Sequence, residues 1–311
     1  MAEDDALRSG DYQYRVLEDG TAEITHYFGR DSVVHIPETL DGKTVTSIRD
    51  VAFSCCSALT TIELPDSVTS IGDGAFAECS FLTIIELPDG VTSIGEYAFL
   101  GCSALTIIEL PDSVTSMGVN PFAGCKLLKN IQVSPEQPVF AVIDGVLFNK
   151  AEKSLICYPD GKQEEAYEVP QGIQQIKSGA FFCCSSLTSI ELPDNVTSIG
   201  EYAFSVCSFL TSIELPDSVT SIGDEAFSWC SALTTIKLPD SVTSIGDQAF
   251  AWCRSLTNIE LPDSVTGIGD QAFWGCDNLT MTVQRDSYAA QYAKDNNLNY
   301  TYPDANDWLN N

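Results

Sequence analysis

Residues 62–84 read IELPDSVTSIGDGAFAECSFLTI, and this stretch recurs along the chain at a step of 23 residues. Further copies begin at Ile85, Ile108, Ile190, Ile213, Ile236 and Ile259. They follow the pattern I-x-L-P-D-x-V-T-x-I-G-x-x-A-F-x-x-C-x-x-L-T-x with few substitutions, and degenerate copies run from Val45 to Leu59 and from Val169 to Leu187. A fixed period of this length predicts an array of coils in which each coil packs only against its neighbours.

The first part of each coil has the pattern of a short strand. Leu59-Thr-Thr-Ile62-Glu-Leu64 fits L-x-x-L-x-L, the strand segment of leucine-rich repeats. Because side chains alternate along a strand, Ile62 and Leu64 are expected to point inward and Glu63 outward. The fold class is therefore an α/β repeat, a leucine-rich-repeat solenoid of 23-residue coils with parallel β-sheets.

The rest of the coil predicts a second extended piece and a helical turn. Val68–Ile71 is expected to be the second strand, and Gly72 to adopt a backbone conformation that a Cβ would resist. Asp73 suits a helix N-cap, with Ala75, Phe76 and Cys79 forming the apolar face of the turn that follows.

Departures from the period define the expected domain organisation. Glu18-Asp19-Gly20 is a hairpin signal, Ser287–Asn297 reads as a short helix, and β-rich runs flank Asn149–Lys153 in a hairpin that begins at Asp144-Gly145 and ends near Tyr158-Pro159. The expected parts are a disordered leader (1–10), an N-terminal β-hairpin cap (11–44), a first repeat block (45–130), an irregular repeat with a β-hairpin insert (131–166), a second block (167–281), a C-terminal helical cap (282–303) and a tail (304–311).

The charge balance excludes several classes of partner. The chain has 44 acidic and 15 basic residues, a net charge of −29. Nucleic acid and anionic membrane surfaces require Lys and Arg, so neither is an expected partner. We expect no membrane insertion, because no apolar run is long enough, and no signal peptide, because the start lacks a basic region followed by an apolar stretch. Basic or cationic partners are favoured.

The repeat resembles a known family. L-T-x-I-x-L-P-x-x-V-T-x-I-G-x-x-A-F-x-x-C is similar to the BspA-type leucine-rich repeat of bacterial cell-surface proteins, over roughly residues 11–302. The segment from Asp144 to Lys162 looks like the insert of that family, and SYAAQYAK from Ser287 looks like its end cap. The resemblance implies an extracellular or cell-surface location and adhesion to host matrix proteins or to other cells. It supplies no catalytic residues.

The outward glutamates form the first candidate site. Glu63, Glu86, Glu109, Glu191, Glu214 and Glu260 occupy one coil position, interrupted by Gln132 and Lys237. This column is either a solvated face or a recognition surface for a basic protein partner. Ile84 and Ile107 lie beside it as expected exposed apolar neighbours.

Three tryptophans form the second candidate site. Trp229 and Trp252 share a register, and Trp274 lies one residue earlier relative to its cysteine. Exposed aromatic side chains suit a glycan or a protein contact. The alternatives are packing on the coil's own surface and an intermolecular contact.

Cysteine also recurs once per coil, at Cys56, Cys79, Cys102, Cys125, Cys184, Cys207, Cys230, Cys253 and Cys276. The favoured interpretation is a column of buried thiols; disulfides between coils have poor expected geometry, and zinc lacks ligand spacing. His26 and His35 have no partnered nucleophile, and no phosphate-binding loop or tuned carboxylate pair is visible. We therefore expect no enzyme activity, metal or cofactor, and a monomeric binding scaffold, with a carbohydrate-binding module or a structural spacer as alternatives.

Overall fold

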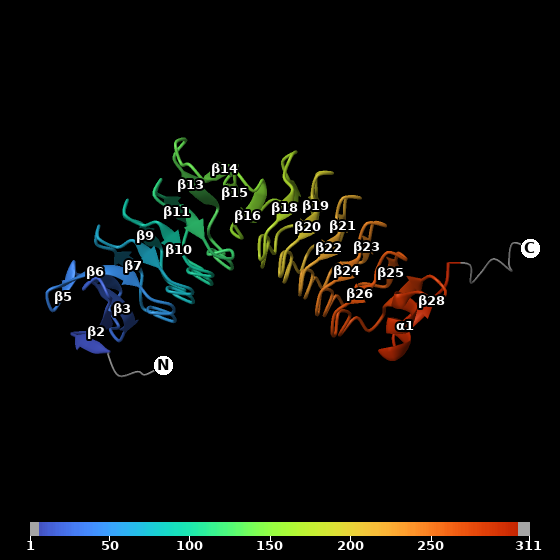
Figure 1. Ribbon diagram of the computed structural model, residues 1–311, viewed down its shortest axis with the longest axis horizontal. Helices are drawn as coiled ribbons and strands as arrows, with labels where there is room; N and C mark the ends of the chain where they lie inside the picture. The colour runs from blue at the N-terminus through green and yellow to red at the C-terminus, as the bar shows by residue number, and fades with distance from the viewer. Residues whose placement is uncertain (1–5, 304–311) are drawn as a thin grey trace, which may run out of the picture. The chain divides into compact units, whose positions relative to one another are not determined.

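Each regular coil contributes two short strands in the computed structural model, which describes residues 6–303 (Figure 1). The described residues form two units: one comprises 6–151 and 156–162, and the other comprises 152–155 and 163–303. Register partners in successive coils lie 23 residues apart, as for Ile62 and Ile85 in the first unit and Ile190 and Ile213 in the second. The expected solenoid with parallel sheets is confirmed.

In the first unit, the first strands of the coils are β4 (Val33–His35), β7 (Thr61–Glu63), β9 (Ile84–Glu86), β11 (Ile107–Leu110) and β13 (Asn130–Val133). The second strands are β6 (Lys43–Ile48), β8 (Ser70–Ile71), β10 (Ser93–Ile94) and β12 (Ser116–Met117), with β5 (Thr39–Leu40) antiparallel to β6. The N-terminal cap is β1 (Leu7–Ser9), β2 (Tyr12–Val16) and β3 (Ala22–Tyr27), and the insert carries β14 (Phe140–Ile143) and β15 (Val146–Asn149).

In the second unit, the first strands are β17 (Ala166–Glu168), β19 (Ser189–Glu191), β21 (Ser212–Glu214), β23 (Thr235–Lys237), β25 (Asn258–Leu261), β27 (Thr280–Val283) and β28 (Asn299–Thr301). The second strands are β18 (Gln175–Ile176), β20 (Ser198–Ile199), β22 (Ser221–Ile222), β24 (Ser244–Ile245) and β26 (Gly267–Ile268). Ser154 and Leu155 of β16 (Ser154–Cys157) pair in parallel with β18. Helix α1 (Tyr288–Asp295) begins after Ser287, whose hydroxyl accepts the Ala290 N–H, and confirms the expected helical cap.

One expectation about the termini needs correction. The expected disordered leader is wrong for residues 7–9, which form β1 and pair antiparallel with β2; residues 1–5 of that leader and the tail 304–311 lie outside the described residues. The expected β-hairpin insert is present, because β15 and β16 are neighbours in one sheet on either side of residues 150–153. Asp144-Gly145, where the insert was expected to begin, forms a tight turn that joins β14 to β15, with positive φ at both residues.

The interior consists of matching side chains stacked from coil to coil. Fully buried phenylalanine rings follow one another at centroid distances of 5.3 Å for Phe53–Phe76 and 5.4 Å for Phe76–Phe99. The same stacking holds in the second unit, at 5.1 Å for Phe204–Phe227 and 5.3 Å for Phe227–Phe250. No single coil can bury its own apolar residues, so this stacking supplies the core.

The third side of the coil is not the expected helical turn. Residues four apart there take positive φ in coil after coil, for example Tyr202 (54°) with Val206 (62°) and Glu225 (50°) with Trp229 (60°). A left-handed residue in every turn stops an α-helix. Alternate N–H groups bond to the next coil, as from Phe204 to the Ala226 carbonyl, and those between bond within the coil, as from Ser205 to the Tyr202 carbonyl. Asp73 is accordingly not a helix cap: its carboxylate accepts the N–H of Glu96 in the following coil.

The repeated glycine after the second strand is explained by close approach rather than by φ. A Cβ on Gly223 would lie 2.6 Å from the Glu201 nitrogen and 2.7 Å from the Gly200 carbonyl carbon, both backbone atoms. Neither atom can move without shifting a neighbouring coil. Glycine is therefore needed at this position because a Cβ would clash with the preceding coil. The expected unusual backbone conformation is not the reason.

Gly223→Ala is expected to lower the free energy of unfolding by about 2 kcal/mol, because the added methyl group forces two coils apart. Gly267→Ala is the matched control, since no atom lies within 4 Å of its Cβ position. Urea unfolding followed by circular dichroism measures both. Equal midpoints for the two variants would contradict the close-approach explanation.

Candidate functional site

The glutamates of the first unit stand in one exposed row across adjacent strands. Glu63 pairs in register with Glu86, and Glu109 pairs with Gln132. All three glutamates are exposed, while Ile62, Ile85 and Ile108 beside them are buried. The paired strands β7 and β9 lie about 4.8 Å apart, so the carboxylates of Glu63 and Glu86 repel one another, whereas β11 with Glu109 begins a separate sheet. The expected outward column is present in this unit.

A histidine of the N-terminal cap extends this row. His35 lies in register with Glu63, and its Nδ1 is 2.6 Å from Glu63 Oε2. Both side chains are mostly exposed. The imidazole therefore partners the carboxylate at the end of the row. No role on the exposed face of the first strands was predicted for His35 from the sequence.

The second unit carries a longer row on its first strands. Glu191 pairs with Glu214, and Lys237 separates Glu214 from Glu260, as the sequence predicts. The row also begins one strand earlier, because Glu168 of β17 pairs with Glu191. Glu168 precedes Val169-Pro170 as Glu63 precedes Leu64-Pro65, and this similarity within a degenerate repeat is the signal that could have revealed it.

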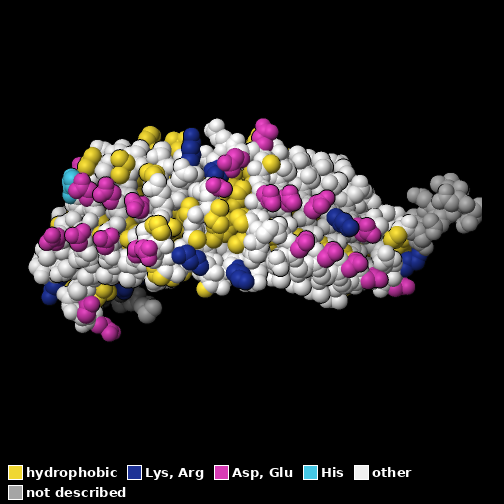
Figure 2. Space-filling model, turned by 90° about the horizontal axis from the view of Figure 1, so that it is seen from above, with side chains coloured by type: hydrophobic (Ala, Val, Ile, Leu, Met, Phe, Trp, Pro, Cys, Tyr) yellow, Lys and Arg dark blue, Asp and Glu magenta, His cyan; other side chains and the backbone are white. Residues whose placement is uncertain are grey.

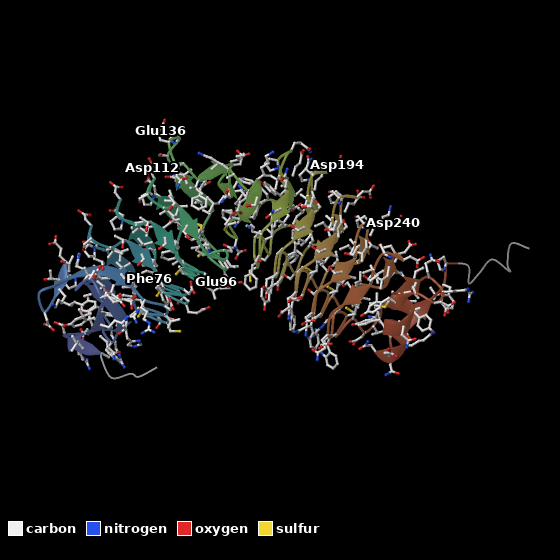
Figure 3. The ribbon with its side chains drawn as sticks, in the orientation of Figure 1. Phe76, Glu96, Asp112, Glu136, Asp194 and Asp240 are labelled. Atoms are coloured by element: carbon white, nitrogen blue, oxygen red, sulfur yellow. The ribbon has the colours of Figure 1, made fainter. Side chains whose placement is uncertain are left out.

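A second acidic row runs parallel to the first in each unit. It consists of the exposed aspartates that end the L-P-D segment: Asp66, Asp89 and Asp112 in the first unit, and Asp194, Asp217, Asp240 and Asp263 in the second. Figure 2 shows acidic side chains in two rows on this face. In Figure 3, Asp112 lies on a different side of its unit from Glu96. These aspartates were not among the candidate site residues predicted from the sequence.

The two units differ in the side chains next to the glutamates. In the first unit, Ile84 and Ile107 are 54% and 45% exposed, as expected, and Val33 adds a third apolar side chain at the same register position. The equivalent positions in the second unit hold Ser189 and Ser212. Figure 2 shows hydrophobic side chains beside the acidic row of the first unit.

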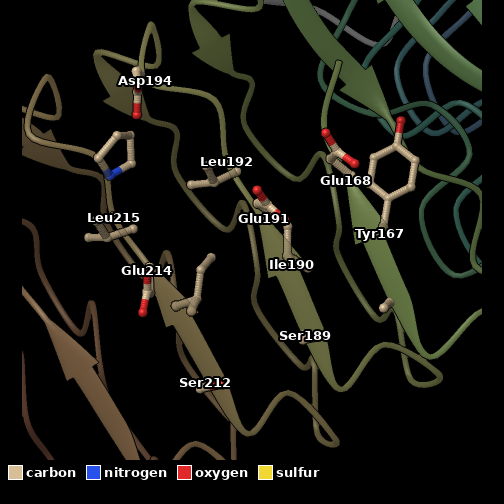
Figure 4. Close-up of a pocket in the computed structure, with 13 residues that line it drawn as sticks. Tyr167, Glu168, Ser189, Ile190, Glu191, Leu192, Asp194, Ser212, Glu214 and Leu215 are labelled. Carbon is tan, nitrogen blue, oxygen red and sulfur yellow. The ribbon is translucent and has the colours of Figure 1, made fainter. Parts of the chain in front are cut away.

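An open groove of about 820 Å³ lies on the acidic face of the second unit. Its floor is the outer face of β17, β19 and β21, and Glu168, Glu191 and Glu214 project from these strands (Figure 4). Leu192, Leu215 and Asp194 form part of its wall. A wide groove with acidic side chains on its floor suits a polypeptide surface better than a small apolar ligand.

The tryptophans do not form one uniform patch. The rings of Trp229 and Trp252 stack with centroids 5.0 Å apart, and the Arg254 guanidinium lies 5.2 Å from the Trp252 ring centroid. Trp252 also covers Gly275, where a Cβ would lie 2.6 Å from the ring. Stacking uses the ring faces that a sugar would need, which favours a packing role for Trp252. Trp274 is 58% exposed, so the glycan hypothesis stays a prediction resting on Trp229 and Trp274.

The cysteines of the column lie buried inside the coils, apart from Cys56. Cys79 donates to the Phe53 carbonyl at 3.1 Å, and Cys102 donates to the Phe76 carbonyl at 3.2 Å. Burial raises the pKa of Cys102 to about 12 and that of Cys276 to about 11, which disfavours the reactive thiolate. The buried-thiol interpretation is confirmed for the column except Cys56, which is only partly buried.

The sequence profile of the BspA type leucine rich repeat region matches residues 35–153 and 157–280, in six copies. The chain belongs to the BspA-type leucine-rich repeat family. No curated protein sequence matches the chain.

Solved structures of bacterial leucine-rich repeat proteins are similar to this BspA-type chain. A leucine-rich cell surface protein of Faecalibacterium prausnitzii is 29% identical with a TM-score of 0.69, covering 94% of this chain and 97% of that one. The pneumococcal vaccine antigen PcpA is 21% identical with a TM-score of 0.68, covering 96% and 98% of the two chains. The PcpA likeness shows the fold alone.

Proteins of this repeat type are generally non-enzymatic and typically bind other proteins. Within residues 6–303, no group of three or more His, Cys, Asp or Glu side chains is placed to hold a metal ion. None of the helices in that range combines the length and apolarity needed to cross a bilayer.

Proposed function

We propose that this BspA-type chain is a non-enzymatic cell-surface adhesin that recognises partner proteins through the acidic face of its first strands. The observation that carries the proposal is the pair of parallel carboxylate rows on one face of each unit, formed by the outward glutamates and the L-P-D aspartates. Their register is fixed by main-chain hydrogen bonds between coils. A rigid row of repelling charges destabilises the fold, and such a cost is offset when a basic partner binds.

The cell-surface location rests on relatives. The family profile covers most of the chain, and the similar protein of Faecalibacterium prausnitzii is a cell surface protein. A surface location also places the acidic face in contact with soluble and matrix proteins of the surroundings. The partner class we infer is therefore an extracellular protein with a basic surface, such as a host matrix protein.

Binding to immobilised fibronectin and fibrinogen at low and high salt tests this function. We expect saturable binding that weakens as salt rises, because exposed charges are screened within about 8 Å at physiological ionic strength. Absence of binding at both salt concentrations would overturn the matrix-adhesin proposal. Binding that is insensitive to salt would remove the acidic face as its site.

A further inference from the structure

The first unit carries apolar and acidic rows side by side, and this arrangement distinguishes it from the second unit. Ile84 and Ile107 are about half exposed, and they lie two residues before Glu86 and Glu109 on the same strands. Val33 is also half exposed at this register position, with Thr61 between it and Ile84. The side chains of the two rows are thus separated by about 6.6 Å along the strand. In the second unit the acidic row is flanked by Ser189, Ser212 and Thr235 instead.

Exposed isoleucines without a packing role indicate a contact surface. Ile62, Ile85 and Ile108 already fill the core positions of these coils, so Ile84 and Ile107 add nothing to the interior. Serine at the same position in the second unit shows that the coil does not require an apolar side chain there. A partner that covers Ile84 and Ile107 gains the free energy of removing this apolar surface from water.

We infer that this face of the first unit binds a cationic amphipathic α-helix of a partner protein, with apolar side chains over Ile84 and Ile107 and Lys or Arg over Glu63, Glu86 and Glu109. The inference rests on the proposed protein-binding function and specifies its partner. Charge complementarity selects the basic side chains, because both acidic rows lie on the same side of the isoleucines, with Glu86 and then Asp89 following Ile84.

The spacing of the coils selects the helix. β9 and β11, which carry Ile84 and Ile107, belong to separate sheets, but the coils of this unit stack with phenylalanine ring centroids 5.3–5.7 Å apart. An α-helix that crosses the strands repeats its faces every 5.4 Å, which matches one turn to one coil. An extended strand repeats a face about every 6.6 Å and a polyproline II segment about every 9.3 Å, so both fall out of register with successive carboxylates.

A synthetic peptide pair tests the inference on the full chain. The probe is an 18-residue helical peptide of Leu and Lys with leucines along one face, and its control contains D-residues at two central positions. The pair has identical composition and charge, but only the first forms a continuous helix. We expect the all-L peptide to bind roughly tenfold more tightly by fluorescence anisotropy, a difference of about 1.4 kcal/mol.

Variants of exposed residues locate the site. Ile84→Ser with Ile107→Ser copies the second unit and is expected to remove the preference for the helical peptide. Ser189→Ile with Ser212→Ile transfers the apolar row and is expected to raise the number of bound peptides per chain from one to two. All four positions are at the surface or only partly buried, so folding is expected to be retained.

Equal affinity for the two peptides, or an unchanged preference in Ile84→Ser/Ile107→Ser, would overturn the helix inference. Neither result affects the proposed adhesin function, which the matrix-protein assay tests separately. Loss of matrix-protein binding together with a retained helix preference would instead remove the matrix partner and leave the helix site in place.

Discussion

Phe227→Ala is expected to lower the free energy of unfolding by about 3–5 kcal/mol, the usual cost of deleting a buried aromatic side chain. Phe227 is fully buried and stacks on both sides, at 5.1 Å from Phe204 and 5.3 Å from Phe250. Because each coil is stabilised through its neighbours, a cavity in one coil weakens two interfaces at once.

Phe209→Ala is the matched control for this prediction, since Phe209 lies in the same unit and is 59% exposed. It is expected to change the free energy of unfolding by no more than about 0.5 kcal/mol. Urea unfolding followed by circular dichroism compares the two variants. Similar midpoints for both would show that the ring stack does not support the coils.

Glu86→Lys with Glu109→Lys is expected to weaken binding to fibronectin and fibrinogen by about hundredfold or more, a loss of roughly 2.7 kcal/mol. The two changes reverse the charge at the same position of neighbouring coils, so a basic partner meets repulsion where it met attraction. Both side chains are exposed, and the fold is expected to be unchanged.

Its control is Glu96→Lys with Asp277→Lys, which alters the net charge of −29 by the same amount at exposed positions outside both acidic rows. This variant is expected to retain nearly full affinity at physiological salt, where distant charges are screened. Surface plasmon resonance at several salt concentrations compares the variants. An equal loss of affinity in both would show that only net charge matters.

The constant 23-residue step made the coil, its inward residues and its outward glutamates predictable from the sequence. Side chains alternate along a strand, so the sequence of one coil is enough to tell that Ile62 and Leu64 point inward and Glu63 outward. The hydrogen-bond partners do not follow from one coil, because the Asp73 carboxylate bonds to the next coil. This hydrogen bond forms only when two coils stack. The residues around Asp73 alone therefore predicted a helix cap instead.

The helical-turn prediction failed because the residue types on that side of the coil do not indicate a left-handed backbone. Left-handed φ is usually a glycine property, yet Val206 and Trp229 adopt it. Stacking against identical coils imposes the conformation on side chains that disfavour it. Two residues of the candidate site could not be predicted for a similar reason. Glu168 lies in a degenerate coil, and His35 joins the row of glutamates only because β4 pairs with β7.

The most direct test of the account is carboxyl footprinting of the chain with and without bound matrix protein. Carbodiimide and glycine ethyl ester label accessible carboxylates, and mass spectrometry compares Glu86, Glu109, Glu191 and Glu214 with the controls Glu96 and Asp277. If the acidic face binds the partner, the partner is expected to protect glutamates of the first strands from labelling and to leave the two controls fully labelled. Unchanged labelling of those glutamates in the bound state, with protection elsewhere, would contradict recognition through the acidic face.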